Sequence, residues 1–337
     1  MRAAGRGMHF AVDGWDPNYG TSFDVEDDVG EAKVRVKVEV ERDPAHWSPI
    51  APTAVHLPDA TVFVDGVRRI EARIWIDNVD AEPDAEPPTE ASAALCASYA
   101  AGSVCCCGRG AHLLTSDTKR GLFTTAPHAV DIDTEAARYT AFHTAPNEAR
   151  GLAATLSGAL QGQLTVLELA AALEARGALS AHGIGDQRDL LVIDGPIRGR
   201  AELPRALGFI KSHQTAYLAP RLHAMVGMLA AGERTPVFLV GTSWDRYSWY
   251  LRLPCLQGQP WAGIARVECA PNILPDQVVE LANLSQVVLP RFASAEYKDS
   301  RAPQNLYPVA GLEKELRRRL GNSALLYRSL RKSAVGS

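Results

Sequence analysis

Two aspartates stand in a sequence pattern that suggests metal chemistry. Asp65 and Asp194 each follow an apolar run and precede a glycine, in the segments 63–66 and 192–195. An acid at the end of an apolar strand lies at the sheet edge, where the turning backbone leaves room. Two converging carboxylates repel each other unless a cation compensates, and their oxygens suit Mg²⁺ or Mn²⁺. A pair of such ions about 4 Å apart can cleave a phosphodiester bond.

Each of these acids has an ordinary alternative, because Asp-Gly is a common turn dipeptide. A third copy, Asp13 with Gly14, runs into a loop-like sequence. The order of the elements favours the metal interpretation. An acid-ended strand, two further strands, a helix with an acid and a second acid-ended strand form the layout of ribonuclease H-like metal nucleases. The helical acid is Glu168, whose flanks are apolar, whereas Glu174 looks like a surface residue near the helix end.

The elements that must position these acids follow from hydrophobic periodicity. Strands are predicted at 33–41, 61–65, 70–76, 95–107, 189–194, 208–211, 237–241, 247–253 and 263–270, and helices at 150–177, 275–287, 311–320 and 323–332. Gly66 is expected to turn the chain, so that 70–76 returns as the antiparallel partner of 61–65. The continuous apolar run at 189–194 is typical of a central parallel strand, and Gly158 or Gly162 could interrupt the first helix.

The domain organisation is expected to be simple. The acidic, proline-rich stretch 78–90 reads as a solvated loop, and strand signals continue across it. We therefore expect one α/β domain at 59–337, built on a ribonuclease H-like mixed sheet flanked by helices. Residues 1–58 are predicted to form an N-terminal β-rich extension.

With these acids and elements in this order, the sequence resembles the NurA-type nucleases, which work beside HerA-type hexameric DNA-translocating ATPases. The matching segments, in order, are 63–66, the helix around Glu168, 191–196, 207–212, 250–253, 289–292 and 303–308. The resemblance implies a Mn²⁺-dependent (or Mg²⁺-dependent) DNA nuclease, active as a homodimer docked on the ATPase. It also implies that Asp65, Glu168 and Asp194 bind the metal. The family often carries a histidine on its C-terminal helix, which 311–320 lacks, so the fourth ligand is unassigned; Asp299 is one candidate.

Basic side chains near the acids are candidates for holding the nucleic-acid backbone. Arg68 and Arg69 follow Asp65 closely, and Arg198 follows Asp194. Each arginine could instead be solvated or form an ion pair. Lys211 lies within an apolar stretch that looks like a strand, so it needs a partner wherever it is buried.

The overall charge conceals an asymmetry that bears on a nucleic-acid partner. The formal net charge of the 337 residues is -4, but residues 1–90 carry 9 basic and 19 acidic side chains, a balance of -10. Residues 91–337 carry 26 basic and 20 acidic side chains, a balance of +6. A net basic region that holds the later acids is compatible with DNA binding, because the local field matters more than the total charge.

The remaining composition indicates an ordinary globular protein. No run of about 18 apolar residues predicts a transmembrane helix, and the N-terminal stretch lacks an apolar signal region, so we expect a cytoplasmic protein with no membrane contact. Six cysteines are interpreted as reduced and mostly buried thiols. The adjacent Cys105, Cys106 and Cys107 cannot all bind one metal, because neighbours on a strand point to opposite faces.

Two alternatives to a DNA nuclease remain open at this point. The first is a catalytically inactive ribonuclease H-like adaptor that docks on an ATPase ring or on DNA, since a fold can be kept after its chemistry is lost. The second is a ribonuclease or a transposase-like strand transferase, which would use the same acids on the same fold.

Overall fold

The computed structural model describes most of the chain: residues 10–12, 34–77, 91–149, 151–185, 187–198, 202–211, 216–255, 261–295 and 302–336. The predicted loop at 78–90, the Asp-Gly pair at Asp13 and the candidate ligand Asp299 lie outside these ranges. None of the described helices is long and apolar enough to cross a membrane.

The strands of the described residues form a single mixed sheet, in the order β2-β10-β11-β12-β9-β8-β3-β4-β5-β7-β6, with β1 paired to β3. Their bounds are β1 Phe10–Val12, β2 Arg35–Lys37, β3 Ala60–Ile76, β4 Ser92–Cys107, β5 Gly110–Thr124, β6 Ile132–Asp133, β7 Arg138–His143, β8 Asp189–Asp194, β9 Ala206–Ile210, β10 Phe238–Gly241, β11 Asp245–Arg252 and β12 Ile264–Cys269.

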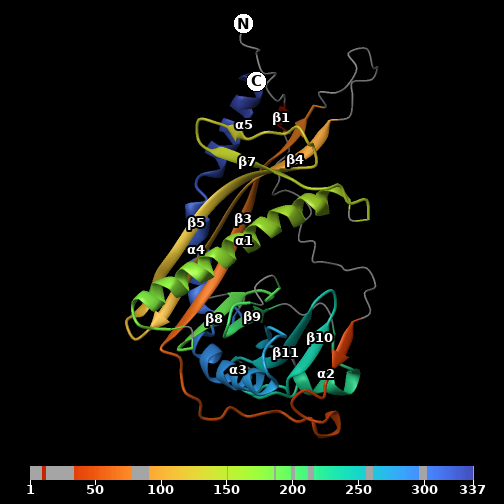
Figure 1. Ribbon diagram of the computed structural model, residues 1–337, viewed down its shortest axis with the longest axis vertical. Helices are drawn as coiled ribbons and strands as arrows, with labels where there is room; N and C mark the ends of the chain where they lie inside the picture. Colours follow the sequence, from red (N-terminus) through yellow and green to blue (C-terminus); the bar gives the residue numbers. More distant parts are fainter. Residues whose placement is uncertain are drawn as a thin grey trace.

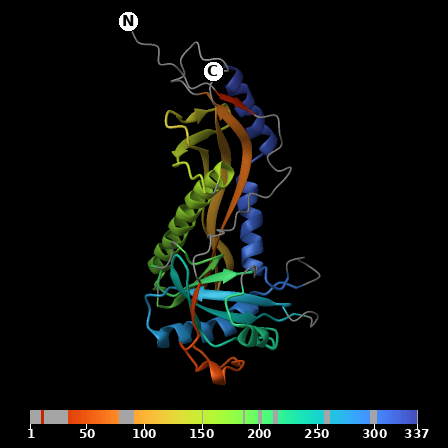
Figure 2. The same ribbon diagram turned by 90° about the vertical axis from the view of Figure 1, so that its right-hand side faces the viewer.

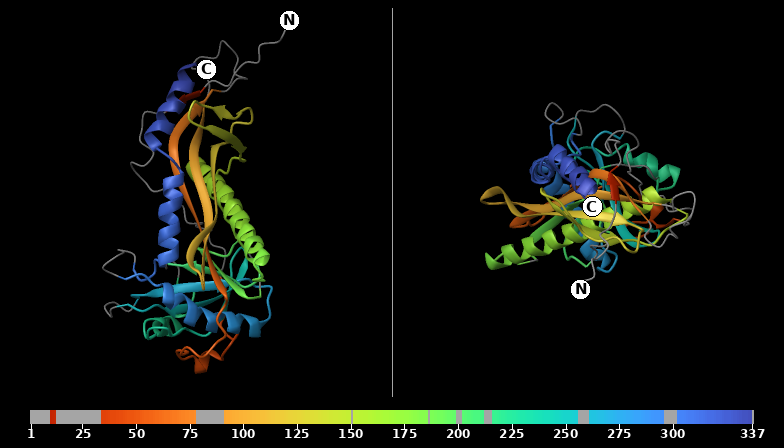
Figure 3. Two further views of the ribbon diagram at one scale, coloured as in Figure 1. Left: turned by 90° about the vertical axis from the view of Figure 1, so that its left-hand side faces the viewer. Right: turned by 90° about the horizontal axis from the view of Figure 1, so that it is seen from above.

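The helices cover both faces of this sheet. They are η1 Pro44–His46, α1 Leu152–Ala181, α2 Pro220–Val226, α3 Pro275–Val288, η2 Leu289–Phe292, α4 Tyr307–Arg319 and α5 Ser323–Gly336. The long helix α1 runs diagonally across one face of β3, β4 and β5 (Figure 1). Helices α4 and α5 line the opposite face, as the edge-on views show (Figures 2 and 3). The expected mixed α/β architecture with flanking helices is therefore present.

The centre of the sheet combines antiparallel and parallel pairing. Strand β3 pairs antiparallel with β4, and β4 pairs antiparallel with β5. On its other side β3 pairs parallel with β8, and β8 pairs parallel with β9. The path β5-β4-β3-β8-β9 thus places β3 in the middle, and α1 lies in the connection that leads from β7 to β8.

The hairpin predicted at Gly66 is wrong. Strand β3 continues without a turn for 17 residues, and Gly66 pairs with Ala101 in the middle of its ladder with β4. The face pattern changes instead at an irregularity between Ile70 and Ala72. Before this irregularity, Val62 and Val64 pack against α1. After it, Ala72, Ile74 and Ile76 pack against α5. A β-bulge inserts one residue and so reverses which side chains face each layer.

Several other boundaries differ from the predictions. The strand expected at 33–41 shortens to β2, and the 15-residue strand β5 was not predicted at all. Helix α1 is continuous through Gly158 and Gly162. The strand predicted at 189–194 coincides with β8, and the three C-terminal helices lie where the periodicity predicted them. Strong apolar periodicity therefore located the elements that pack on one another.

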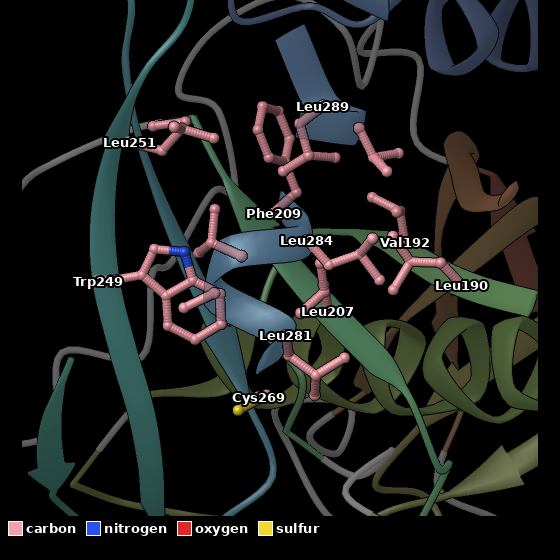
Figure 4. Packing of buried hydrophobic residues seen from close by; sticks show 14 of the residues in the cluster. Leu190, Val192, Leu207, Phe209, Trp249, Leu251, Cys269, Leu281, Leu284 and Leu289 are labelled. Atoms are coloured by element: carbon pink, nitrogen blue, oxygen red, sulfur yellow. The ribbon is translucent and has the colours of Figure 1, made fainter. Parts of the chain in front are cut away.

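The largest buried cluster lies between the sheet and α3. Figure 4 shows Phe209 and Trp249 among the leucines of β8, β9, β11 and α3. The indole of Trp249 donates to Ser285 Oγ at 3.0 Å, so its one polar group is satisfied inside the cluster. This packing fixes β8 and β9 relative to β3, and it therefore positions the residues at the ends of those strands.

Candidate active site

Asp65 and Asp194 lie side by side on neighbouring strands. Val64 of β3 pairs with Ile193 of β8 in the parallel ladder, so the two acids occupy the next position on each strand. Phe63 and Val192, two residues before each acid, pack in the same cluster. Side chains two apart share a face of a strand, so both carboxylates point toward the layer of α3 and α4. Asp65 is buried and Asp194 half-buried.

Only one of the two acids ends a strand. Asp194 is the last residue of β8, as predicted, and Gly195 then turns the chain with a φ of 113°. The amide of Ile197 donates to the buried carboxylate of Glu268 at 2.7 Å, which holds the turn in place. Asp65, by contrast, lies in the interior of β3, opposite Gly102. The prediction that Asp65 ends a strand is wrong. The prediction that Asp65 and Asp194 lie close together agrees with the structure.

Helix α1 brings Glu168 to the same stretch of β3. Glu168 is 4% exposed, whereas Glu174 is exposed, so the structure favours Glu168 as the helical acid near the site. A Cβ atom added at Gly66 would lie 2.5 Å from Glu168 Oε1, so this carboxylate lies against the backbone next to Asp65. It approaches from the α1 face, where Val64 packs near Ala172. Glycine at position 66 is what leaves room for this approach.

The backbone and one lysine compensate part of the negative charge. The amide of Gly66 donates to Asp65 Oδ1 at 2.7 Å. Lys211, just past β9, donates from Nζ to Asp194 Oδ2 at 2.7 Å and to Asn305 Oδ1 at 3.1 Å. Lys211 is half-buried, and it has the partner that its apolar sequence surroundings required.

The pKa of the Asp65 carboxyl is raised to about 8, mainly because burial disfavours its charged form. The negative charge of Asp194 raises this pKa further, as does Glu313 on α4 to a smaller extent. The ammonium of Lys211 and the amide of Gly66 act in the opposite direction. Because this pKa lies above 7, the Asp65 carboxyl is mostly protonated at neutral pH in the metal-free protein.

Sequence reasoning missed two residues of this site. Asn305 is buried immediately before α4 and accepts the hydrogen bond from Lys211. Glu313 projects from α4, is close enough to affect Asp65, and also pairs with Arg317 at 2.9 Å. Neither has a spacing signal, because helix α4 meets β3 only through tertiary packing. Glu313 is therefore a further carboxylate near Asp65, contributed by α4.

The acids of this site offer carboxylate oxygens, and these are the ligands that Mg²⁺ and Mn²⁺ prefer. The carboxylates do not converge on one point. Among the described residues, one group of three has its ligating atoms within 4.8 Å of one another, and it consists of Cys105, Cys107 and His112 rather than of these acids. Two acids share one face of β3, whereas Glu168 reaches it from the other.

The three candidate arginines lie in different environments. Arg68 Nη1 lies 3.5 Å from the carbonyl oxygen of Ser157 and 3.4 Å from its hydroxyl on α1. Arg69 pairs with the buried Glu71 at 2.7 Å and donates to the carbonyl of Gly321 at the end of α4. Arg198 lies in the exposed turn after β8. Arg198 is therefore the one of the three whose position leaves most surface for a nucleic-acid backbone.

We expect Arg69→Ala to destabilise the fold rather than to change nucleic-acid binding. The Glu71 side chain is 1% exposed, and removal of its partner leaves a buried charge uncompensated, at a cost of about 3 kcal/mol. Arg198→Ala should instead keep the wild-type stability, weaken DNA binding and lower the salt dependence of log K by about 1. Urea denaturation and DNA titrations at several salt concentrations distinguish the two; an Arg69 variant as stable as wild type contradicts the assignment.

We expect Gly66→Ala to reduce both stability and any activity of the site. The added methyl group would lie 2.5 Å from Glu168 Oε1 and 2.7 Å from Leu164 Cδ1, an overpacking that costs about 1–3 kcal/mol. Gly158→Ala on α1 is the matched control, because nothing lies within 4 Å of its added Cβ; it should stabilise the protein by about 0.5–1 kcal/mol. The double variant Gly66→Ala/Glu168→Asp should recover part of the stability that Gly66→Ala loses, because the shorter acid leaves room for the methyl group. If Gly66→Ala unfolds at the same urea concentration as wild type, Glu168 does not lie against Gly66.

No protein-family model and no curated protein sequence matches this chain. Among solved structures it is similar to the NurA nuclease from Sulfolobus solfataricus, at 12% sequence identity and a TM-score of 0.42, over 85% of this chain and 88% of that one. It is also similar to Argonaute from A. aeolicus, at 13% identity and a TM-score of 0.32, over 80% of this chain and 29% of that one. Similarities at this level leave the site to be interpreted from its own geometry.

Proposed function

We propose that the protein is a divalent-metal-dependent nuclease that hydrolyses phosphodiester bonds. The observation that carries this proposal is the pair of Asp65, which is buried, and Asp194, which is half-buried, on adjacent parallel strands. Glu168 packs against Gly66 from the α1 face. The path β5-β4-β3-β8-β9 supports it, because it is the arrangement expected of a ribonuclease H-like sheet. Asp65, Glu168 and Asp194 are the proposed metal-binding acids, and Mn²⁺ or Mg²⁺ is the proposed ion.

The charge balance of the site favours a cation. Asp65 and Asp194 lie close enough to repel each other in a buried environment, and Lys211 is shared between Asp194 and Asn305. A divalent ion held by these acids would supply positive charge to the phosphate oxygens in the transition state and would lower the pKa of a bound water. We therefore propose that the acids hold the ion and that their mutual repulsion is relieved when it binds.

The protein's own residues then have separate tasks. Asp65 and Asp194 would hold the ion from the α3 and α4 face of the sheet. Glu168, which packs against Gly66 from the α1 face, is proposed as the third acid on the basis of the sequence resemblance. Lys211 forms an ion pair with Asp194, and its ammonium would also hold a phosphate oxygen of the substrate. Asn305 is a positioning residue, because its side-chain oxygen accepts the hydrogen bond that orients Lys211. Glu313 adds a further carboxylate from α4.

The substrate and partners are proposed as a set. We propose DNA as the substrate, in line with the basic balance of residues 91–337. We propose a cytoplasmic homodimer docked on a HerA-type ATPase, with a role in processing DNA ends, on the basis of the sequence resemblance alone. The division into an extension at 1–58 and a nuclease domain at 59–337 also stays a prediction, although β1 and β2 both pair with strands of the main sheet.

A cleavage assay with labelled DNA tests the proposal. Linear and covalently closed circular DNA, with RNA of the same sequence as a comparison, are incubated with Mn²⁺, Mg²⁺ or EDTA. We expect cleavage of DNA only with a divalent ion, and loss of the circular substrate indicates an endonuclease. Absence of cleavage with either ion, from protein that is folded by circular dichroism, contradicts the proposed activity.

A catalytically inactive adaptor is the second candidate, and one observation favours it. Lys211 already neutralises Asp194 without an ion, so the site is partly satisfied by the chain itself. An adaptor binds DNA or an ATPase ring with the same affinity in EDTA and in Mn²⁺, and it cleaves nothing. Binding measured in parallel with the cleavage assay therefore separates the two candidates.

A further inference from the structure

The tip of the β4–β5 hairpin gathers three soft metal ligands that play no part in the proposed acidic site. One ligating atom from each of Cys105, Cys107 and His112 lies within 4.8 Å of the other two. The cysteines are free thiols. The sequence analysis included the three adjacent cysteines but not His112, which the β4–β5 hairpin places opposite Cys105.

The backbone brings these residues together for a simple geometric reason. Cys105 and Cys107 are two apart on β4, so they share one face. His112 is the direct cross-strand partner of Cys105, and Cys107 pairs with Gly110 across the two-residue turn. Opposite residues in an antiparallel pair face the same side. Cys106 points to the other face and packs with the cluster under α3, as the strand argument predicted.

The surroundings of the triad are partly apolar. Cys105 is buried, and Cys107 and His112 are half-buried. Cys105 packs with Leu179 near the C-terminal end of α1, and Leu114 and Ile184 border the same cluster. The register shifts between Ser103 and Val104 of β4, a bulge of the kind that often lies beside functional sites. A low-dielectric wall on one side strengthens the attraction between thiolates and a cation.

We propose that Cys105, Cys107 and His112 bind a transition-metal ion of the Zn²⁺ class. Zn²⁺ prefers thiolate and imidazole ligands, which lie about 3.5–3.8 Å apart in a tetrahedral site, so the side chains need to move only slightly. Three protein ligands leave a fourth position for water or for a group of a bound partner. Binding fixes the end of the long β4–β5 hairpin, where a two-residue turn alone joins the strands.

This site differs from the acidic site in position and in chemistry. Cys105 pairs with Val62, three residues before Asp65 on β3, and lies on the α1 face, whereas Asp65 points to the α4 face. Thiolate and imidazole ligands select Zn²⁺ or Co²⁺, whereas carboxylates suit Mg²⁺ and Mn²⁺. The two proposals can therefore fail independently.

Titration of the reduced full-length protein with Co²⁺ tests the site. Co²⁺ replaces Zn²⁺ and reports thiolate ligands by a sulfur-to-cobalt charge-transfer absorption. We expect one equivalent to give this absorption in wild type, and Cys107→Ser or His112→Ala to weaken binding by at least about 100-fold. Cys106→Ser is the matched control and should titrate as wild type. Added Zn²⁺ should displace the Co²⁺ and raise the melting temperature of wild type but not of Cys107→Ser.

Two results overturn this inference: wild type that shows no thiolate-to-cobalt absorption, or a Cys106→Ser variant that loses it as fully as Cys107→Ser. Asp194→Asn should retain the full absorption, because it alters only the acidic site. If the absorption is present while nucleic acid is never cleaved, the thiol site stands and the nuclease proposal fails.

Discussion

Asp194→Asn is expected to abolish metal-dependent cleavage while leaving the protein folded. The substitution preserves the size of the side chain and its hydrogen bond from Lys211 but removes one of the two carboxyl groups that lie side by side on β3 and β8. Loss of a group that stabilises the transition state electrostatically costs about 10²–10³ in rate, and loss of a metal ligand should cost at least this much. Single-turnover cleavage of labelled DNA in Mn²⁺ measures the effect.

The matched control for this experiment is Asp117→Asn. Asp117 lies on β5, 54% exposed, and pairs with Lys119, so its replacement removes the same charge away from the site. It should cleave at the wild-type rate. An Asp194→Asn variant that cleaves as fast as Asp117→Asn rules out Asp194 as a metal-binding acid. If neither wild type nor the variant cleaves but both bind DNA equally, the adaptor is the better description.

Asp65→Asn is expected to stabilise the metal-free protein, and increasingly so as the pH rises. The pKa of Asp65 is about 8 in the folded protein against 3.8 for the ordinary group. A raised pKa means that the folded state binds the proton more tightly. The stability that this proton provides is therefore complete below pH 3.8 and is lost as the pH rises toward about 8. If the whole shift is expressed, the loss is on the order of 5 kcal/mol.

The measurement is the difference in free energy of unfolding between Asp65→Asn and wild type, from urea denaturation in EDTA between pH 5 and pH 9. We expect this difference to grow with pH across the range, since asparagine has no proton to lose. Added Mn²⁺ should stabilise wild type selectively and shrink the difference. A difference that does not change with pH shows that Asp65 titrates normally and that burial does not disfavour its charge.

Removal of an acid from this site does not have the same effect at each position. Two converging carboxylates repel each other, so loss of either Asp65 or Asp194 is expected from the sequence to relieve repulsion. The structure restricts this expectation to Asp65, because Asp194 has its own ion pair with Lys211. Asp194→Asn weakens that pair as it relieves the repulsion, so its melting temperature without metal should change less than that of Asp65→Asn.

Much of the framework could be predicted from the sequence because the relevant signals are local. The apolar run that forms β8, and the amphipathic stretches that form α3, α4 and α5, require burial whatever their partners are. Glu168 could be recognised because its neighbours in the helical sequence are apolar, which indicates that this acid is buried. Its exposed fraction in the structure is 4%. Lys211 was recognisable by the same reasoning, and its partner is present.

The errors have a common cause in tertiary pairing. Gly66 carries a strong turn signal, yet β3 continues through it, because the ladder with β4 satisfies the backbone on both sides and Glu168 fills the space that a side chain would take. Arg69 looked like a phosphate ligand because it lies close to Asp65 in the sequence. Arg69 does share a face of β3 with Asp65, but there it pairs with Glu71, the residue at the bulge, and donates to the chain at the end of α4.

The sequence by itself determined which residues could do chemistry and which elements carry them: two aspartates after apolar runs, one glutamate on an apolar helix, and a lysine at the end of a strand. Only the tertiary structure decided which of these residues meet. The parallel register of β3 and β8 puts Asp65 beside Asp194, α1 crosses at Gly66, and α4 adds Glu313. Likewise the β4–β5 register brings His112 to Cys105. Contacts between distant segments depend on strand register and packing, for which no local pattern of residues carries the information.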